Sequence, residues 1–291
     1  MKIIEEEIIK IIKDALEEDI GKGDITTQLC VPSDKKVVAY VVGKKEGILC
    51  GIEVAKKVFE TVDPSLKFSS LKREGEEIER NERIAKIEGE ARSILTAERV
   101  AINFLSFLSG VASYTRKFVE KVKGTKVKIM DTRKTIPNLR KLEKYAVRVG
   151  GGVNHREGLW EGILIKDNHL RAAKVVCQGR VEGKKLEEIF KVIRGHFPDK
   201  TIEIEVENIA EFKEVATYKP DIILLDNFDL DSIKEAVKLR NSYFPAIKLE
   251  VSGGVNLDNV EEIARCGVEV ISIGSITHSS PSLDFSLEVV A

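Results

Sequence analysis

The chain has 291 residues, 43% of them hydrophobic, which is enough apolar material for one large domain or for a large and a small one. Its 47 basic and 48 acidic residues leave a net charge of −1, so a nucleic-acid binder with a basic surface stripe is not expected. The most apolar long segment, residues 100–114, contains Asn103, Ser106, Ser109 and Gly110, which favours a buried helix over a membrane span.

Two features bear on location. The first ten residues, MKIIEEEIIK, are acidic where a secretory signal is basic, so export is not expected. The cysteines have neither disulfide-framework nor zinc-ligand spacing; they are Cys30, Cys50, Cys177 and Cys266. Free thiols of this kind are typical of a reducing compartment, and we expect a cytoplasmic protein.

Residues 1–110 predict a small domain that combines helices with a sheet. A helical pattern covers residues 3–18 and ends at Gly21. Thr96 is a candidate N-cap, so we expect a long helix from there to about residue 122 that links this domain to the rest. The small domain should be an α+β sandwich, because four β-type runs follow the first helix and enclose one helical pattern (52–61); the runs are 36–42, 47–50, 66–71 and 83–88.

From residue 127 onward, strand patterns alternate with helical ones. Repeated βα units imply parallel strands with right-handed crossovers, and six or seven of them favour an α/β barrel. We predict an incomplete barrel, with a doubly wound open sheet as the alternative. The predicted strands are 127–130, 162–165, 202–206, 222–225, 247–251 and 270–273, and the predicted helices are 139–149, 186–196, 209–217, 231–239 and 257–266.

Two of these strands have an apolar face and a charged face. An open sheet that is covered on both sides would instead have nearly continuous apolar strands. The alternation therefore favours a barrel with polar groups in its lumen, although an exposed edge strand would produce the same pattern. The side chains expected to face inward are Glu203, Glu205 and Glu207 in one strand and Lys248, Glu250 and Ser252 in the other.

Positive charge is concentrated in residues 131–169, around a run of three glycines at 150–152. The cationic residues of this stretch are Arg133, Lys134, His155, Arg156 and Lys166. Because the chain as a whole is balanced in charge, such a concentration beside strand ends predicts a pocket for a ligand with several anionic groups. A solvated basic loop is the alternative for either cluster taken alone.

Polar and glycine residues follow the other predicted strands, where barrel enzymes place their active sites. Ser252, Gly253 and Gly274 follow the last two strands and suggest a phosphate site, with His278 just beyond. Glu205 and Asp226 should be ionised among so many cations, which favours binding of ribose hydroxyls or Mg²⁺, although ion pairs with Lys166 or Lys248 are equally compatible.

These motifs together resemble quinolinate phosphoribosyltransferase over nearly the whole chain. The resemblance is based on long motifs in the expected order: EDIG at 18–21, GDITT at 23–27, AER at 97–99, DTRKT at 131–135, LEKYA at 142–146, GGG at 150–152, NHR at 154–156, IKDNH at 165–169, LDNF at 225–228, SGGV at 252–255 and THS at 277–279. Asn138, Val149, Val153 and Glu157 depart from the usual pattern, and the last two flank His155 and Arg156.

The resemblance implies an enzyme that condenses quinolinate with phosphoribosyl pyrophosphate to give nicotinate mononucleotide, pyrophosphate and CO₂ in NAD biosynthesis. It also implies a cytoplasmic homodimer, with the possibility of higher assembly, and a catalytic barrel at 111–278 with residues 279–291 packed on the first domain. Nucleic acids and membranes are not expected as partners. A transferase that uses nicotinate, a relative associated with molybdenum transport and a non-catalytic metabolite-binding protein are the alternatives.

The resemblance also implies roles for individual residues. Catalysis would depend on Lys134, Lys166, Glu205 and Asp226, and Mg²⁺ would be held through the substrate, with Glu205 and Asp226 as further ligands. The quinolinate pocket would contain Arg133, His155, Arg156 and Lys166, with Arg99 supplied by the partner subunit. Lys134, Glu205, Asp226, Ser252, Gly253, Gly274 and His278 would bind the phosphoribosyl group.

Overall fold

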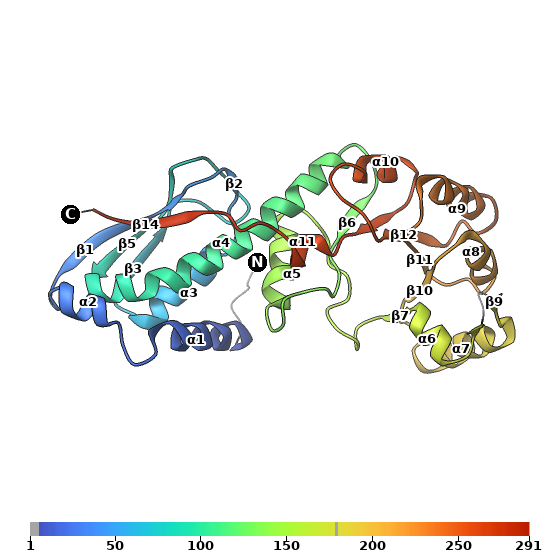
Figure 1. Cartoon of the computed structure of the whole chain (residues 1–291), viewed down its shortest axis with the longest axis horizontal. Coiled ribbons are helices and arrows are strands. Elements are labelled where there is room, and N and C mark those ends of the chain that lie inside the picture. The colour runs from blue at the N-terminus through green and yellow to red at the C-terminus, as the bar shows by residue number, and fades with distance from the viewer. Residues whose placement is uncertain (1–5, 178–179, 291) are drawn as a thin grey trace. The chain divides into compact units, whose positions relative to one another are not determined.

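The computed structural model describes residues 6–177 and 180–290 and forms two compact units (Figure 1). The first unit contains residues 1–116, 134–152 and 275–291, and the second contains residues 117–133 and 153–274. The units are therefore discontinuous in sequence, and the domain boundary predicted at residue 110 stays a prediction. Residues 3–5 of the first predicted helix lie outside the described part of the chain.

The first unit is built on a four-stranded antiparallel sheet with the order β14-β1-β5-β3. The last strand of the chain is an edge strand of this sheet, and the Leu283 backbone N–H donates to the Ser106 carbonyl at 2.9 Å. The strands of the first unit are β1 (Lys36–Gly43), β2 (Gly47–Ile48), β3 (Lys67–Ser70), β4 (Glu77–Ile78), β5 (Glu82–Glu90) and β14 (Phe285–Val290); β2 and β4 pair with each other in a separate two-stranded sheet. Its helices are α1 (Glu6–Ile20), α2 (Ile25–Cys30), α3 (Ile52–Val62), α4 (Ala91–Lys121), which continues into the second unit, α5 (Arg140–Val149) and α11 (Ser275–His278).

The long helix α4 begins earlier than the sequence predicts. It begins at Ala91, so the prediction of Thr96 as the N-cap is wrong. The Thr96 hydroxyl instead lies 3.1 Å from the Asp24 carboxylate, while Asp24 itself caps α2. Within the described residues, α4 is the single helix whose length and composition would allow a membrane span, but 61% of its most apolar window is buried in the protein. Core helices pass the same test, so this is weak support for a membrane segment.

The second unit is a six-stranded parallel sheet with the order β6-β13-β12-β11-β10-β7. This is the cyclic chain order of a barrel in which only the pairing of β6 with β7 is missing. The incomplete barrel is thus confirmed, and the doubly wound alternative is wrong because the strand order does not reverse. The strands are β6 (Lys128–Met130), β7 (Ile163–Ile165), β10 (Ile202–Val206), β11 (Ile222–Asp226), β12 (Lys248–Ser252) and β13 (Val270–Ser272).

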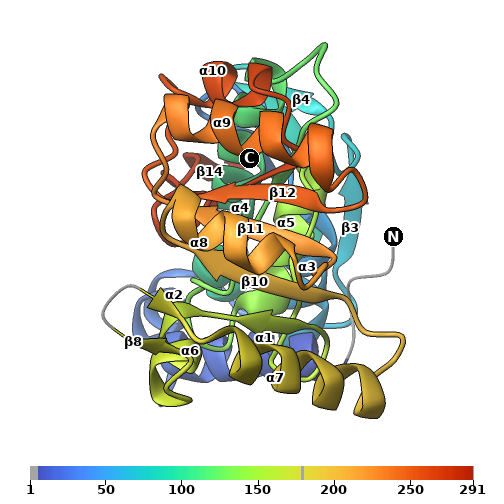
Figure 2. The ribbon, with the colours of Figure 1, turned by 90° about the vertical axis from the view of Figure 1, so that its right-hand side faces the viewer.

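Helices connect successive strands of this sheet and lie along its outer side (Figure 2). Apolar residues of the strands face them, as the alternation predicts: Ile202, Ile204, Leu249 and Val251 are all at most 2% exposed. The helices are α6 (Asp167–Ala172), α7 (Gly183–His196), α8 (Ile209–Ala216), α9 (Leu230–Tyr243) and α10 (Val260–Arg265), and a short hairpin of β8 (Val176–Cys177) and β9 (Arg180–Val181) precedes α7.

Candidate active site

The carboxyl ends of the barrel strands bring together most of the predicted site residues. Parallel strands place these ends at one edge, so residues that are distant in sequence become neighbours. Asp226 and Ser252 end β11 and β12 and are paired in register. The other predicted residues at these ends are Arg133 after β6, Lys166 after β7, Glu205 in β10, Gly253 after β12 and Gly274 after β13.

Three predicted residues belong to the first unit. Arg99 lies in α4, with its side chain 59% exposed and 3.6 Å from Glu98. The Lys134 carbonyl accepts a hydrogen bond from Thr277 at 2.7 Å, and His278 ends α11. Their predicted places beside the substrates stay predictions.

Lys166 and Glu205 form an ion pair across neighbouring strands. The Lys166 ammonium lies 2.6 Å from Glu205 Oε2; its side chain is 44% exposed and that of Glu205 is 9% exposed. The pair is the structural salt bridge that the sequence left open as an alternative. Because the lysine is half exposed, it is still accessible to an anionic ligand.

The turns after β11 and β12 approach each other closely. Gly253 has a φ of 87°, and a Cβ there would lie 2.9 Å from the Asn227 backbone nitrogen, so no other residue fits without a shift. Asn227 also has a positive φ, and its side-chain amide donates to Asp226 at 2.8 Å. A wide hollow of about 610 Å³ lies beside these turns and is lined in part by Asn227, Gly253 and Gly254.

A connecting segment occupies the edge of β6 that has no strand partner. Val153 forms a parallel bridge with Met130, and its N–H donates to the Ile129 carbonyl at 2.8 Å. The fully buried Asp131 carboxylate then accepts the Asn154 side-chain amide at 2.5 Å and the His155 N–H at 2.8 Å. Residues 153–155 are therefore fixed to the end of β6 by backbone and carboxylate hydrogen bonds.

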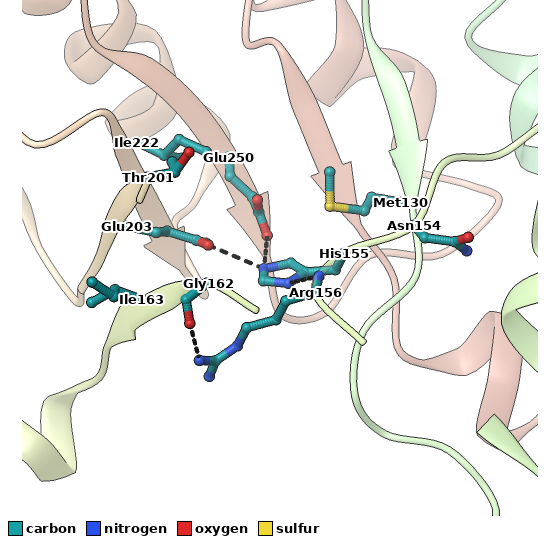
Figure 3. Close-up of a pocket in the computed structure, with 10 residues that line it drawn as sticks. All are labelled: Met130, Asn154, His155, Arg156, Gly162, Ile163, Thr201, Glu203, Ile222 and Glu250. Carbon is teal, nitrogen blue, oxygen red and sulfur yellow. Dashed lines mark hydrogen bonds and ion pairs between the residues drawn. The ribbon is translucent and has the colours of Figure 1, made fainter. Parts of the chain in front are cut away.

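Beside this segment, the barrel lumen contains a cavity of about 180 Å³ whose lining includes two glutamates (Figure 3). Glu203 from β10 and Glu250 from β12 point into it and are 5% and 1% exposed, as the alternation predicts. The alternation also predicts that Lys248 and Glu207 face inward, but neither is buried. Lys248 is exposed, and Glu207, beyond the end of β10, pairs with Arg171 at 3.3 Å.

His155 extends from the segment into this cavity, between the two glutamates (Figure 3). Its Nε2 lies 3.1 Å from Glu203 Oε2 and 3.9 Å from Glu250 Oε1. The Ser272 hydroxyl donates to the same Glu250 oxygen at 2.5 Å. Burial raises the pKa of Glu250 to about 7, and the charge of Glu203 acts in the same direction, whereas His155 and Ser272 oppose it.

One nitrogen of the Arg156 guanidinium group is hydrogen-bonded to the protein, and another has no described partner. Its Nη1 donates to the Gly162 carbonyl at 2.8 Å, just before β7, while its Nε is buried and has no hydrogen-bond partner among the described residues. Partial burial lowers the pKa of Arg156, the nearby charge of Arg133 lowers it further, and Glu203 acts in the opposite direction. A guanidinium that lines the cavity, with a second one near enough to affect its pKa, forms a site suited to carboxylates.

The sequence prediction missed four residues of this site. Glu203 and Glu250 were expected to face the lumen but received no role, and Asp131 and Asn154 appeared only within motifs. The alternation places the two glutamates inside but does not reveal their partner, because His155 lies outside any strand. The carboxylate directly after β6 was the one signal that could have indicated Asp131.

Comparison with known proteins places both parts of the chain in one family. Residues 24–109 match the N-terminal domain of quinolinate phosphoribosyl transferase and residues 111–288 match its C-terminal domain. This chain belongs to the quinolinate phosphoribosyl transferase family. The carboxylating nicotinate-nucleotide pyrophosphorylase of Mycobacterium leprae is 38% identical over 96% of this chain and 95% of its own length.

Solved structures agree with this family assignment. The nicotinate-nucleotide pyrophosphorylase of Ehrlichia chaffeensis is 39% identical, covers the whole of both chains and has a TM-score of 0.89. That of Francisella tularensis is 37% identical, with a TM-score of 0.88 over 98% of this chain and 96% of its own. The resemblance identified from the sequence motifs is thus confirmed at the level of the family and its fold.

The raised pKa of Glu250 predicts a specific pH dependence of stability in this family member. The carboxyl group binds its proton more tightly when folded than when unfolded, where its pKa is near 4.5. Unfolding therefore releases a proton between about pH 4.5 and 7, and the free energy of unfolding falls as pH rises through this window, by up to roughly 1.4 kcal/mol per pH unit.

Glu250→Gln should remove this dependence. Urea unfolding of the variant and the parent protein at pH 5, 6 and 7 should show the stability of the variant rising relative to the parent as pH increases. Glu203, His155 and Ser272, the groups that face Glu250, are the same in both proteins. Parallel stability curves would show that Glu250 titrates normally.

Proposed function

We propose that this protein condenses quinolinate with phosphoribosyl pyrophosphate, giving nicotinate mononucleotide, pyrophosphate and CO₂ for NAD biosynthesis. Family membership over nearly the whole chain supports the reaction type. Within the structure, the observation that carries the substrate assignment is Arg156, which lines the cavity, has a buried Nε that no described residue satisfies, and lies near the charge of Arg133. A dicarboxylate would supply an acceptor for the Arg156 Nε and negative charge beside both cations.

On this proposal, different cationic residues bind different anionic groups of the two substrates. Arg156 would bind one carboxylate through its Nε edge, since its Nη1 is occupied by Gly162. Arg133 would bind the other carboxylate. Lys166, which is half exposed, would face the anions from β7, and Lys134 would stabilise the departing pyrophosphate.

Glu205 and Asp226 are proposed to act on the phosphoribosyl side. Both are carboxylates at the ends of adjacent strands, and carboxylate oxygens are the donors that Mg²⁺ prefers, so they fit a metal bound together with the substrate. Mg²⁺ would neutralise charge on the pyrophosphate. The carboxylates themselves would hold the ribose hydroxyls and stabilise positive charge at the anomeric carbon, while Ser252, Gly253, Gly274 and His278 would bind the 5′-phosphate.

The loss of CO₂ needs no further catalytic group. When the pyridine nitrogen bonds to the ribose carbon and pyrophosphate departs, the ring becomes a cationic pyridinium. The carbon–carboxylate bond can then break with its electron pair drawn toward the ring nitrogen, and a proton replaces CO₂ on the ring.

We also propose a cytoplasmic location, supported by the free thiols of Cys30, Cys50 and Cys266.

The first prediction from this proposal concerns the carboxylate pocket. Arg156→Ala and Arg133→Ala should each raise KM for quinolinate about 10- to 100-fold, because each removes a charge-assisted contact of roughly 1.5–3 kcal/mol. Steady-state kinetics with both substrates varied measures this. Arg171→Ala is the matched control, since Arg171 is 55% exposed and pairs only with Asp167 and Glu207 in the interactions described for it. Equal quinolinate saturation in all three variants would refute the pocket.

The second prediction separates the two substrate subsites. Glu205→Gln and Asp226→Asn should lower kcat at least tenfold while quinolinate binding, measured by calorimetry without the co-substrate, changes little. Glu207→Gln serves as the control, because Glu207 follows the same strand but is exposed and pairs with Arg171. Loss of quinolinate binding with normal turnover at saturation would mean that the subsites are reversed.

We further propose a homodimer in which Arg99 serves the partner's active site. The exposed Arg99 side chain, whose nearest described partner is the adjacent Glu98, is available for such a role. Arg99→Ala and Arg133→Ala should each be inactive at low quinolinate, and a mixture of the two should recover activity after subunit exchange, because one site of the hybrid combines both arginines. Exchange that is verified by mass spectrometry without recovery would contradict sharing.

A further inference from the structure

We propose that Glu203, beside the buried Glu250, is a positioning residue that holds His155 as a neutral imidazole with its hydrogen on Nε2. Through His155 it fixes the backbone at Arg156. This inference rests on the proposed function for its consequence in catalysis, but the tautomer itself does not depend on it. It adds a positioning role to the place in the quinolinate pocket that the family resemblance implies for His155.

The tautomer follows from a hydrogen bond to the backbone. The Arg156 N–H donates to His155 Nδ1 at 2.7 Å. A backbone N–H can only donate, so Nδ1 must offer a lone pair and carry no hydrogen. The hydrogen of the neutral ring is then on Nε2, which lies 3.1 Å from Glu203 Oε2. An imidazolium would place an N–H against an N–H at Nδ1.

The two glutamates explain why the Nε2 side accepts this hydrogen. Their side chains are 6% and 1% exposed; Glu203 Oε2 lies within hydrogen-bond distance of Nε2, whereas Glu250 Oε1 lies 3.9 Å from it. Two ionised carboxylates so close in a buried lumen repel each other, and both burial and the charge of Glu203 raise the pKa of Glu250. Glu203 Oε2 is the nearer oxygen and accepts the Nε2 hydrogen, and the charge of Glu203 also stabilises the nearby Arg156 guanidinium.

The consequence for the substrate follows from Arg156. Its backbone is tied to the His155 ring and its Nη1 to Gly162, so the orientation of the remaining Nε edge is set at two points. If the His155 ring flipped or lost its hydrogen bond to Glu203, the Arg156 backbone would no longer be held by the ring. Quinolinate binding should suffer from that release more than the chemical step does, because the same carboxylate contacts exist in the ground state and the transition state.

A metal ion is the competing occupant for these three residues, because their ligand atoms lie within 4.8 Å of one another and Glu203 Oε1 is buried without a hydrogen-bond partner among the described residues. A metal on Nε2 would need its lone pair, which moves the hydrogen to Nδ1, against the Arg156 N–H. Ligating histidines normally donate from their second nitrogen, and here that nitrogen accepts. The observed hydrogen bond therefore favours the neutral, metal-free arrangement.

Two measurements on the full-length protein test the proposal. The first is ¹⁵N NMR of the histidine rings, with His155 assigned from the spectrum of His155→Gln. We expect a single neutral tautomer with an unprotonated Nδ1 from pH 6 to 8. An Nδ1–H tautomer, an imidazolium, or a His155 signal shifted by a stoichiometric metal in metal analysis of the purified protein would each overturn the proposal, whether or not the protein has activity.

The second measurement is kinetic and compares Glu203→Leu with Glu203→Gln. Leu removes the acceptor, so KM for quinolinate should rise at least tenfold with kcat and the KM for phosphoribosyl pyrophosphate within threefold. Gln keeps an oxygen acceptor, so its KM should stay within threefold of the parent value. Equal effects of Leu and Gln, or a folded Leu variant with unchanged KM, would refute positioning through the hydrogen bond.

Glu74→Gln is the control for the loss of a partly buried carboxylate. Glu74 lies in the first unit, where it accepts the Gly51 N–H at 3.0 Å, and it should affect the melting temperature without changing the KM for quinolinate. If the parent protein failed to use quinolinate at all, the proposed function would fall, whereas the NMR result would still decide the tautomer.

Discussion

The free edge of β6 is the constraint on which the geometry of the site depends. In a closed barrel, β7 would occupy that edge, and the chain between the two strands would pass outside the lumen. Here residues 153–155 lie on the edge instead, and the Asp131 carboxylate anchors them from the end of β6. The missing strand pair thus creates the room in which His155 reaches inward and Arg156 reaches toward β7.

Electrostatics then determines which atoms of the site are already occupied and which are available. The glutamates of the lumen have partners on the protein: Glu205 binds Lys166, and Glu203 and Glu250 surround His155. Arg156 is different, since the nearby charge of Arg133 lowers its pKa and its Nε is buried without a described acceptor. An anionic group beside Arg156 would supply the missing acceptor and offset the repulsion between the two cations.

The sequence predicted the barrel well because its signals are local. Period-two alternation in 202–206 and 247–251 placed Glu203 and Glu250 inside, and the βα repeat placed the strand ends together. It failed where a distant partner decides: Thr96 looks like a helix cap, but Asp24 takes its hydroxyl and the helix begins at Ala91. No single segment of the sequence indicates that His155 lies beside both glutamates, or that β6 and β7 are the strands left unpaired. Both features depend on how the strands come together in the folded barrel.

The position of β14 has a consequence for how the protein is made. Gly43 in β1 pairs with Phe285, so the sheet of the first unit lacks one edge strand until nearly the whole chain has been synthesised. At typical rates of about 5–20 residues per second, β1 has an open edge for roughly 10–50 s after it leaves the ribosome. An unpaired strand edge is a template for association with other chains. The nascent chain therefore passes through a period in which its first sheet is exposed to mispairing or to chaperones.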